Sequence, residues 1–565
     1  MIIEGLTEAQ SRVVQYEGHA LVVACPGSGK TKTMASKAAW VLTCNPEAKV
    51  LAVSFTRDSA AELKSRILAS VPNPSDVRQR LSVGTFHAIA LEQLRRSDIR
   101  LKLLSDTESH LMLERAVALT GLDISLEEAR QAVDFGLAGG KLPERGPWAV
   151  VFQAWQNLMQ RVGAHDLGSI LPLAVDGMKH GRVRPLMADV ILADECQDAD
   201  DAQLEWLLLH ARAGSVVTIV GDDDQAIYGW RKARGHAGMM AFQKALDARL
   251  LQLDINFRCR QEILDFAGKI LIPVRDRVAK NLKAARGKGG KVSVFFATSR
   301  AEEAEAAVRW CAQTPESSTA ILVRSNFHLN DLEAACLGQN VAYIRADGES
   351  LFDERGATLL VALLKAARLK DDAAMELVLA ATGESEKNIS RLSKRHGAAR
   401  TVLNTLDDQK SKQIKNISKT PLREAIGLAA DWLMKVFKNQ PAVSRSIGPA
   451  ARVLMKIQNH NNKPQSLTSC LAAIRRRQEK QKNGVILMTM HGSKGLEFDR
   501  VWIARAAVGI TPHRMGLIDE ERRLFYVAAT RAKDYLVLSC GAPDMPSPFW
   551  QEGNLSLSDH TVCFG

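Results

Sequence analysis

The residues with the clearest chemical potential form a glycine-rich segment, Ala24-Cys-Pro-Gly-Ser-Gly-Lys-Thr31, which follows an apolar run and precedes a helical pattern. Gly27 and Gly29 let backbone N–H groups approach a phosphate closely, and the next helix adds the positive end of its dipole. Lys30 would reach the β- and γ-phosphates of a nucleotide, and Thr31 would hold Mg²⁺. Because a strand precedes and a helix follows, the segment predicts a phosphate-binding loop rather than a chance turn.

Two acidic segments follow other apolar runs. In Asp194-Glu-Cys-Gln-Asp198, Asp194 would hold Mg²⁺ directly or through water, and Glu195 would orient and deprotonate the attacking water. Adjacent carboxylates can also simply begin a turn, but the phosphate loop favours the catalytic interpretation. In Val220-Gly-Asp-Asp-Asp-Gln225, Gln225 could reach the γ-phosphate and report its presence, although three acids alone are more typical of a solvated turn.

A helical pattern near the C-terminus carries an arginine at its end. In Asp519-Glu-Glu-Arg-Arg-Leu-Phe-Tyr-Val-Ala-Ala-Thr-Arg531, Leu524 and Val527 share one apolar face, and Arg531 falls on the same face. An arginine there would be costly to bury unless it met an anion at a domain boundary, which favours an arginine finger. The alternative is an arginine whose stem lies along the helix end while its head reaches water.

Short apolar runs that alternate with helical patterns predict buried parallel strands. In the first half of the chain they are 20–24, 50–55, 190–193 and 216–220, and in the second half 291–297, 320–324, 501–504 and 535–539. The alternation predicts an α/β fold with two doubly wound parallel sheets, whose ligands bind at the carboxyl ends of the strands.

Two mostly helical stretches interrupt this alternation, and the second carries basic clusters at Lys410–Lys415 and Arg475–Arg477. We therefore expect two α/β domains, each with a helical insertion. The first domain is expected over residues 1–87 and 189–253 with its insertion at 88–188, and the second over 254–372 and 483–565 with its insertion at 373–482.

The composition limits the class of protein further. Lys and Arg total 75 against 63 Asp and Glu, a net charge of +12, and this favours a polyanionic partner. The nine cysteines are odd in number and lack Cys-x-x-Cys spacing, so we expect reduced thiols rather than disulfides or a zinc site. The first residues lack a signal-peptide pattern and no apolar run is long enough to span a bilayer, so we expect a cytoplasmic protein without membrane association.

Further motifs complete a pattern that resembles the UvrD/Rep/PcrA branch of superfamily 1 helicases. They are Leu6-Thr-Glu-Ala-Gln10, Phe55-Thr-Arg-Asp-Ser-Ala-Ala-Glu-Leu63, Val83-Gly-Thr-Phe-His87, Gly221 to Arg231 (GDDDQAIYGWR), Asn256-Phe-Arg258, Thr489-Met-His-Gly-Ser-Lys-Gly-Leu-Glu-Phe498 and Thr530-Arg-Ala532. The resemblance covers nearly the whole chain. It implies two RecA-like P-loop domains with ATP between them, Mg²⁺ as a cofactor, and hydrolysis of ATP to ADP and phosphate coupled to 3′-to-5′ movement on single-stranded DNA.

The same resemblance implies roles for individual residues. Gln10 would contact adenine, Phe257 would stack on it, and Glu497 would hold the ribose. Arg258 and Arg531 would contact the γ-phosphate from the second domain. The expected nucleotide-binding set also contains the whole phosphate loop, namely Ala24, Cys25, Pro26, Gly27, Ser28, Gly29, Lys30, Thr31 and Lys32.

Aromatic and polar residues beyond the nucleotide motifs predict a DNA-binding face. Tyr228 and Trp230 come shortly after Gln225, and aromatics in such places can stack on bases without choosing a sequence. Each aromatic taken singly is more typical of a core, but the family pattern favours DNA contact. The expected DNA-binding residues are Phe55, Thr56, Thr85, Phe86, His87, Tyr228, Trp230, Arg231 and His491.

The sequence also departs from the family pattern. Phe257 stands in place of the usual Tyr, Ala24 in place of a more common glycine, and Lys32 in place of an Arg. The insertion at 373–482 is shorter than in the housekeeping members, and 381–386 is a poor substitute for their Gly-Ile-Gly hairpin. The shorter insertion concerns the handling of duplex DNA, partner binding and regulation, and not the ATPase.

Several functions remain open for such a motor. The expected partners are single-stranded DNA and tailed duplex DNA, with a separate nuclease subunit as a possible addition. One alternative is the motor of an antiphage defence system that acts with that nuclease, and another is an ATP-switched DNA-binding protein that does not unwind. A fused helicase–nuclease is disfavoured because few residues follow Arg531. Repair, replication, and plasmid or phage replication all use motors of this kind.

Overall fold

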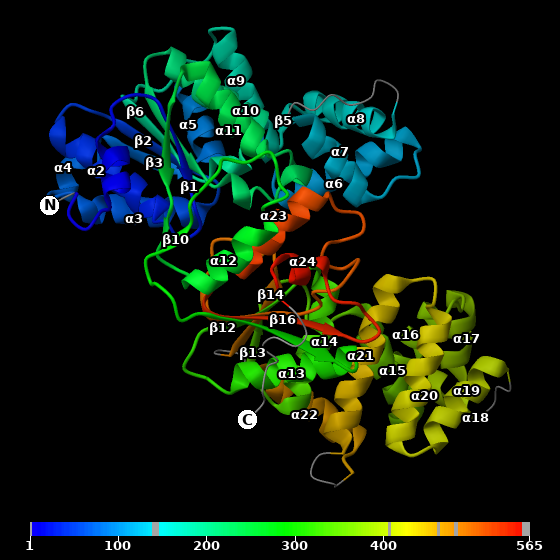
Figure 1. Cartoon of the computed structure of the whole chain (residues 1–565). Helices are drawn as coiled ribbons and strands as arrows, with labels where there is room; N and C mark the ends of the chain where they lie inside the picture. The colour runs from blue at the N-terminus through cyan, green and yellow to red at the C-terminus, as the bar shows by residue number, and fades with distance from the viewer. Residues whose placement is uncertain (1–2, 138–145, 405–407, 460–463, 480–483, 556–565) are drawn as a thin grey trace. The chain divides into compact units, whose positions relative to one another are not determined.

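The computed structural model describes residues 3–137, 146–404, 408–459, 464–479 and 484–555 (Figure 1). The chain divides into two compact units. Unit 1 contains Met1–Leu264 and Leu271–Lys288, and unit 2 contains Asp265–Ile270 and Gly289–Gly565. Each unit is built on a six-stranded parallel sheet, which confirms the predicted α/β class with two parallel-sheet domains.

The sheet of unit 1 has the strand order β3-β2-β6-β7-β1-β8. Its strands are β1 (Ala20–Ala24), β2 (Val50–Ser54), β3 (Leu81–Thr85), β6 (Val190–Ala193), β7 (Val216–Gly221) and β8 (Arg249–Leu253). β1 and β2 are buried along their whole length, and β6 and β7 are buried after their first residue, as expected for a parallel sheet covered on both faces. The order places β7 directly between β1 and β6, so the residues that follow these three strands share one edge of the sheet.

Helices cover both faces of this sheet. One face packs against α1 (Glu8–Gln15), α2 (Lys30–Cys44), α3 (Arg57–Ser70) and α4 (Pro74–Val77). The other packs against α5 (Phe86–Arg96), α9 (Ile170–Lys179), α10 (Asp201–Arg212) and α11 (Gly235–Leu246). Along β1, Ala20 and Val22 belong to the first core while Leu21 and Val23 belong to the second. This is the two-fold alternation of a strand.

The first insertion has a small core of its own. It is formed by α6 (Asp106–Thr120), α7 (Leu126–Leu137) and α8 (Pro147–Val162), with Trp155 among its buried residues. A two-stranded parallel pair, β4 (Lys102–Leu103) and β5 (Ala164–His165), brackets the three helices, and a short 3₁₀ turn, η1 (Leu167–Ser169), leads into α9. The predicted stretch 88–188 is therefore mostly helical in its described part.

The sheet of unit 2 has the strand order β11-β16-β15-β12-β14-β13. Its strands are β11 (Lys291–Ala297), β12 (Thr319–Val323), β13 (Tyr343–Arg345), β14 (Val485–Thr489), β15 (Phe498–Ile503) and β16 (Ala532–Gly541). The helices of this part are α13 (Arg300–Ala312), α14 (Leu329–Gln339), α15 (Arg355–Leu369), α23 (Ile518–Ala529) and α24 (Pro548–Glu552), together with the short turn η5 (Asn326–His328).

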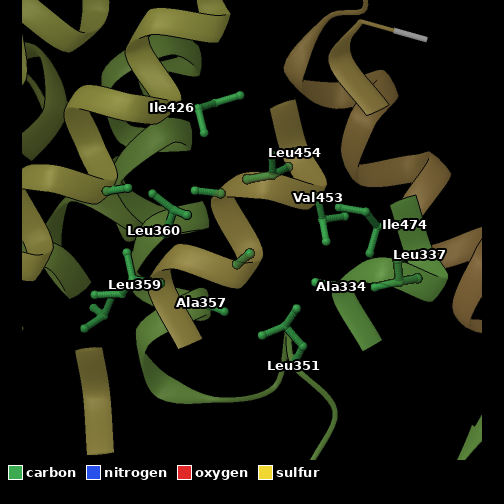
Figure 2. Close-up of a cluster of buried hydrophobic side chains, with 14 of the residues drawn as sticks. Ala334, Leu337, Leu351, Ala357, Leu359, Leu360, Ile426, Val453, Leu454 and Ile474 are labelled. Carbon is green, nitrogen blue, oxygen red and sulfur yellow. The ribbon is translucent and has the colours of Figure 1, made fainter. Parts of the chain in front are cut away.

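The second insertion is helical, as its sequence pattern predicted, and shares a core with the neighbouring helices of unit 2. Its helices are α16 (Asp372–Ala381), α17 (Glu386–His396), α18 (Ala398–Asn404), α19 (Gln409–Lys419), α20 (Leu422–Val436), α21 (Pro441–Gln458) and α22 (Leu467–Glu479). Figure 2 shows Leu337 of α14 and Leu360 of α15 in one apolar cluster with Leu454 of α21 and Ile474 of α22. The insertion is therefore joined to unit 2 by continuous apolar packing.

The segment that follows the first sheet lies elsewhere than the sequence suggested. We expected the second domain to begin at residue 254, but 254–264 and 271–288 belong to unit 1. There β9 (Ile255–Asn256) pairs with β10 (Lys283–Ala284), and α12 (Gln261–Ile270) crosses from one unit to the other. The eight cysteines within the described residues are all free. None of the described helices is long and apolar enough to cross a membrane.

Candidate nucleotide and DNA sites

The phosphate loop joins the end of β1 to the start of α2. Gly27 and Gly29 adopt left-handed backbone angles, with φ of +60° and +78°. A Cβ at Gly27 would lie 2.7 Å from the Cβ of Arg258, and one at Gly29 would lie 2.9 Å from the Nε2 of Gln10. Both glycines are therefore required by backbone conformation and by close approach. The hydroxyl of Ser28 is buried without a hydrogen-bond partner among the described residues, which fits a loop that closes on a ligand.

Lys30 is the first residue of α2 and points at carboxylates from the neighbouring strand ends. Its Nζ lies 3.2 Å from Oε1 of Glu195. Burial alone would lower the pKa of Lys30, but the charges of Glu195, Asp222 and Asp194 outweigh burial and raise that pKa. The side chain is 11% exposed and therefore a largely buried, charged ammonium, the group that a nucleotide phosphate requires.

The two acids after β6 take different positions. Asp194 is buried, accepts a hydrogen bond from the backbone N–H of Glu195 (2.9 Å), and receives the Thr31 hydroxyl at 3.4 Å. Burial, followed by the charge of Glu195, raises the pKa of Asp194 to about 7. Glu195 has a φ of +54°, a conformation that costs a non-glycine residue about 1–3 kcal/mol. This backbone turns Glu195 toward Lys30.

The oxygen donors of Thr31 and Asp194 suit a divalent cation such as Mg²⁺, which prefers hard oxygen ligands. The electrostatic environment fits as well, because burial and Glu195 both disfavour the charged form of Asp194 and a cation would reverse this. The hydroxyl and the carboxylate are already within 3.4 Å of each other. These residues therefore fit the metal that the sequence predicted.

Gln197 connects the two acidic turns, and the sequence did not single it out. It lies in the 3₁₀ turn η2 (Cys196–Asp198), and its side-chain amide donates to Oε2 of Glu195 at 2.5 Å. Its carbonyl oxygen accepts the backbone N–H of Asp222 at 3.0 Å. A Cβ at Gly221 would lie 2.7 Å from this carbonyl oxygen, so the glycine gives Gln197 its space. Its place two residues after Glu195 was the signal that could have identified it.

Gln225 is buried in the 3₁₀ turn η3 (Asp223–Gln225), which follows β7. Its amide nitrogen donates to Oδ2 of Asp222 at 2.5 Å. Because β7 lies between β1 and β6, this turn is at the same sheet edge as Lys30 and Glu195. The structure thus brings together the five predicted residues Lys30, Thr31, Asp194, Glu195 and Gln225.

The segment 256–258 packs directly on the phosphate loop within unit 1. The side-chain amide of Asn256 donates to the Pro26 carbonyl at 2.5 Å, and the backbone N–H of Phe257 donates to the Gly27 carbonyl at 2.9 Å. The ring of Phe257 is 44% exposed, so a face is available for stacking on a planar ligand. Arg258 lies in unit 1 and not, as expected, in the second domain.

Gln10 lies beside the same loop. It completes a capping box with Thr7 at the start of α1, and its amide nitrogen donates to the Ser28 carbonyl at 3.0 Å. Lys32, the residue after Thr31, donates to the carbonyl of Gly5 at 2.8 Å. Cys25 and Ala24 are buried in the strand end, and burial raises the pKa of the Cys25 thiol above its usual range. Cys25 is therefore a neutral thiol.

Three predicted site residues lie in unit 2. Glu497 is exposed and lies 3.1 Å from Lys533. Arg531 follows α23, is 1% exposed, and donates through Nε to the carbonyl of Val527 (2.8 Å) and through Nη1 to that of Leu496 (3.1 Å). His491 is half-buried in the turn after β14. In unit 2, Arg531 thus joins the end of its helix to the loop before β15 that carries Glu497.

The predicted DNA-binding residues of unit 1 fall at two neighbouring strand ends and in the turn after Gln225. Ser54 of β2 pairs with Thr85 of β3, so Phe55 and Phe86 follow adjacent strands, with ring centroids 5.5 Å apart. Thr56 and Thr85 are the N-caps of α3 and α5. His87 is half-buried, and burial lowers its pKa.

The aromatic residues in this group differ in accessibility. Trp230, in the 3₁₀ turn η4 (Gly229–Arg231), is 60% exposed and meets Tyr228 edge-on at 6.3 Å. Phe86 is 1% exposed and packs between Phe55 and Trp206 of α10. The expectation that Phe86 contacts DNA is therefore corrected, because its ring is part of the core. The side chain of Arg231 lies outside the described part of the structure.

Unit 1 combines a phosphate loop, an acid pair of which Asp194 is buried and Glu195 partly exposed, and a buried glutamine at one edge of a parallel sheet. This arrangement defines a P-loop nucleoside triphosphatase. The family model described as "UvrD/REP helicase N-terminal domain" matches residues 6–132 and 122–246. The family model described as "UvrD-like helicase C-terminal domain" matches residues 251–419 and 431–542. The chain belongs to the UvrD/REP helicase family, and as a member it is an ATP-hydrolysing DNA helicase.

Individual relatives resemble the chain over most of its length. DNA helicase II of Haemophilus influenzae is 27% identical, across 95% of this chain and 84% of the relative. The ATP-dependent DNA helicase PcrA of Leuconostoc citreum is also 27% identical, across 95% of this chain and 82% of its own. The ATP-dependent DNA helicase Rep of Buchnera aphidicola is 24% identical across 94% of both chains.

Proposed function

We propose that this chain is a single-stranded-DNA-dependent ATPase that moves 3′ to 5′ and uses that movement to separate strands or displace proteins. The observation that carries the proposal is the joined set Lys30–Glu195–Gln197–Asp222–Gln225 at the carboxyl edge of the first sheet. A charged lysine, a carboxylate and a glutamine in one network are the groups that phosphoryl transfer to water needs.

Each group of the site has a proposed role in hydrolysis. Lys30 and the loop amides bind the β- and γ-phosphates, and Glu195 accepts a proton from the attacking water. Gln225 contacts the γ-phosphate or that water. Thr31 and Asp194 would hold Mg²⁺, which when bound neutralises charge on the β- and γ-phosphate oxygens. Arg258 and Arg531 would offset the charge that develops on the transferred phosphoryl group.

The rest of the nucleotide is assigned to residues around the loop. Phe257 is proposed to stack on the adenine through its exposed ring, and Gln10 to contact the adenine edge. Glu497 is assigned to the ribose on the basis of the family resemblance. The remaining loop residues, Ala24 to Ser28 and Lys32, would supply backbone contacts and shape.

Single-stranded DNA is the proposed track, with Trp230 and Tyr228 as base-stacking residues and Phe55, Thr56, Thr85, His87 and His491 as further contacts. The second insertion supports contact with a longer polyanion. Residues 373–482 hold 21 Lys and Arg against eight Asp and Glu, whereas the remainder of the chain is nearly neutral. Phosphate contacts of this kind give affinity without sequence preference. We therefore include tailed duplex DNA as a substrate.

We retain the proposed division into two ATPase domains with helical insertions at 88–188 and 373–482, and a cytoplasmic location. A partnership with a separate nuclease, as in antiphage defence, stays a second possibility that rests on the compact second insertion. An ATP-switched DNA-binding protein is disfavoured because Lys30, Asp194, Glu195 and Gln225 are all present and assembled.

Unwinding assays on three duplexes test the proposal: one with a 3′ tail, one with a 5′ tail and one blunt. We expect ATP-dependent strand separation of the 3′-tailed duplex, with little activity on the others. Removal of streptavidin from the 3′ or 5′ end of a biotinylated single strand measures movement without strand separation. This assay therefore distinguishes a translocase that does not unwind duplexes from a helicase that does. Preferential unwinding of the 5′-tailed duplex would overturn the proposed 3′-to-5′ direction. Absence of DNA-dependent ATP hydrolysis in the wild-type chain would overturn the proposal that it is a motor.

A further inference from the structure

A buried ion cluster lies immediately behind the proposed catalytic groups. The Nζ of Lys280 lies 2.7 Å from Oδ1 of Asp222, 2.6 Å from Oδ1 of Asp223 and 2.7 Å from Oδ2 of Asp224. All four side chains are 0% exposed. An ammonium that meets three carboxylates in the interior is strongly constrained, because losing one partner leaves uncompensated buried charge.

The remaining carboxylate oxygens are also bonded. Arg277 forms a two-pronged pair with Asp224, from Nε to Oδ1 and from Nη2 to Oδ2, each 2.7 Å. The backbone N–H of Val278 donates to Oδ2 of Asp223 at 2.6 Å. The grouping of three aspartates therefore holds a lysine ammonium in the place that a metal ion would take. Burial opposes the charge on Lys280, but the carboxylates outweigh burial and raise its pKa.

This cluster is connected to the proposed catalytic residues through one residue, Asp222. Asp222 accepts Lys280 on Oδ1 and the amide of Gln225 on Oδ2, at 2.7 and 2.5 Å. The backbone N–H of the same residue donates to Gln197, whose amide in turn donates to Glu195. A continuous series of hydrogen bonds thus runs from Lys280 to both the proposed sensor and the proposed base.

The position of Lys280 in the chain adds a second feature. The chain leaves unit 1 within α12 and returns to it at Leu271. Lys280, Arg277 and Val278 belong to this returning segment, 271–288. The ion cluster therefore attaches the returning segment, which lies in sequence between the two stretches of unit 2, to the end of β7 beside the nucleotide site.

We propose that Lys280 is a positioning residue for ATP hydrolysis. It fixes Asp222, whose carboxylate orients Gln225 and whose backbone N–H, through Gln197, orients Glu195. Lys280 is not assigned any contact with nucleotide. This inference rests on the proposed roles of Gln225 and Glu195, and it extends the site to a residue 55 positions beyond Gln225.

The test uses a charge-balanced pair in the full-length chain. Lys280→Met alone leaves three buried carboxylates against one arginine and is expected to destabilise unit 1. Asp223→Asn with Lys280→Met keeps the net charge of the cluster, and the Asp223 carboxylate contacts Lys280, the backbone of Val278 and His236. We expect the pair to melt near the wild-type temperature, whereas Lys280→Met melts lower.

In the charge-balanced pair, the rate of ATP hydrolysis should change much more than the affinity for nucleotide. We expect the pair to lower kcat of DNA-stimulated ATP hydrolysis by about tenfold or more, because a misplaced base loses part of its 10²–10⁴-fold contribution. The affinity for a non-hydrolysable ATP analogue should change by less than about threefold. Arg130→Met, which removes a partly exposed ion pair with Asp166 in the first insertion, is the control for loss of a salt bridge.

A double-mutant cycle with Gln225→Ala decides how Lys280 acts. Residues that act through each other give non-additive effects, whereas independent sites add. We therefore expect the pair to lower the single-turnover rate much less in the Gln225→Ala background than in wild type. The proposal would be overturned if the charge-balanced pair lowered the single-turnover rate equally in both backgrounds. It would also be overturned if this pair regained both the stability and the kcat of wild type. Either result would leave Lys280 with a purely structural role.

Comparison with Lys30→Ala distinguishes failure of the Lys280 proposal from failure of the proposed function. If Lys30→Ala hydrolyses ATP at the wild-type rate, the assigned nucleotide site is wrong, and the positioning role of Lys280 is overturned together with it. If Lys30→Ala is inactive while the charge-balanced pair is fully active, the proposed function stands and the positioning role of Lys280 fails.

Discussion

Lys30 and Glu195 form an ion pair with 3.2 Å between Nζ and Oε1, although they follow strands that are not neighbours in the sheet. Both side chains reach across the end of β7, which separates β1 from β6. A phosphate bound at Lys30 would share this ammonium with Glu195. The pair therefore places the candidate base beside the group on which it is proposed to act.

The Glu195→Gln variant is predicted to bind ATP but hydrolyse it about 10²–10⁴-fold more slowly. Glutamine keeps the size of the side chain and leaves Asp194 in place, but it cannot accept the proton from water. Nucleotide affinity and single-turnover hydrolysis, measured on the same preparation, check this prediction.

The matched control for that variant is Glu205→Gln. Glu205 lies on α10 and pairs with Lys179 at 3.1 Å. We expect it to hydrolyse ATP normally. A collapse of nucleotide affinity in Glu195→Gln would mean that Glu195 is structural and that its proposed role as a base is wrong.

The Trp230→Ala variant is predicted to weaken binding of single-stranded DNA by about tenfold or more, since stacking of one base is worth about 1–3 kcal/mol. Because Trp230 is 60% exposed, its removal should leave the melting temperature nearly unchanged. DNA-stimulated ATP hydrolysis should fall more than the basal rate. Titration with a fluorescent oligonucleotide and thermal melting provide both measurements.

Phe86→Ala is the contrasting control for Trp230→Ala. Its ring is 1% exposed, so truncation should leave a cavity and cost about 3–5 kcal/mol of stability. Basal and stimulated ATP hydrolysis should then fall together. If Trp230→Ala lowers the melting temperature and Phe86→Ala does not, the assignments of exposed and core aromatic residues are reversed.

His210 is predicted to make the stability of unit 1 depend on acidity. It is fully buried, its Nδ1 lies 2.8 Å from the Trp206 carbonyl and its Nε2 lies 3.5 Å from the Gln93 amide. Burial lowers the pKa of His210 to about 4. Between that value and about 6.5 the unfolded chain binds a proton that the folded chain does not, so stability falls as the pH falls through this window.

The expected loss from this one residue is about 2 kcal/mol between pH 7.5 and pH 5. Melting temperatures at the two pH values, for wild type and His210→Gln, measure it. The wild type should lose more stability than the variant over the same interval. Equal losses in both proteins would show that His210 does not contribute.

The phosphate loop and the acidic turns could be predicted because their chemistry lies in contiguous residues next to strongly apolar strands. β1 and β6 were predicted with their observed limits, Ala20–Ala24 and Val190–Ala193. Four strands of the two six-stranded sheets, β3, β8, β13 and β14, were not predicted, although β14 is itself a mostly apolar run. Arg249 opens β8 and only three residues form β13, so neither gives the continuous apolar run of a buried strand.

The remaining parts of the site depend on contacts between distant residues. Lys280 lies in a basic, turn-like stretch, and nothing local indicates that its ammonium is buried against aspartates 56 to 58 positions earlier. Phe86 was misassigned because its motif lies at a strand end, where its neighbours are polar. Only the three-dimensional packing against Trp206 identifies Phe86 as a core residue.

The most direct test is the rate of ATP hydrolysis with and without a single-stranded oligonucleotide, for wild type and Lys30→Ala. Lys49→Ala serves as the control, since Lys49 is exposed just before β2, at the opposite edge of the sheet from the site. We predict strong stimulation by DNA in wild type and Lys49→Ala, and no turnover in Lys30→Ala, which should still bind the oligonucleotide. A wild-type rate that DNA does not change, or a Lys30→Ala rate equal to wild type, would contradict the account.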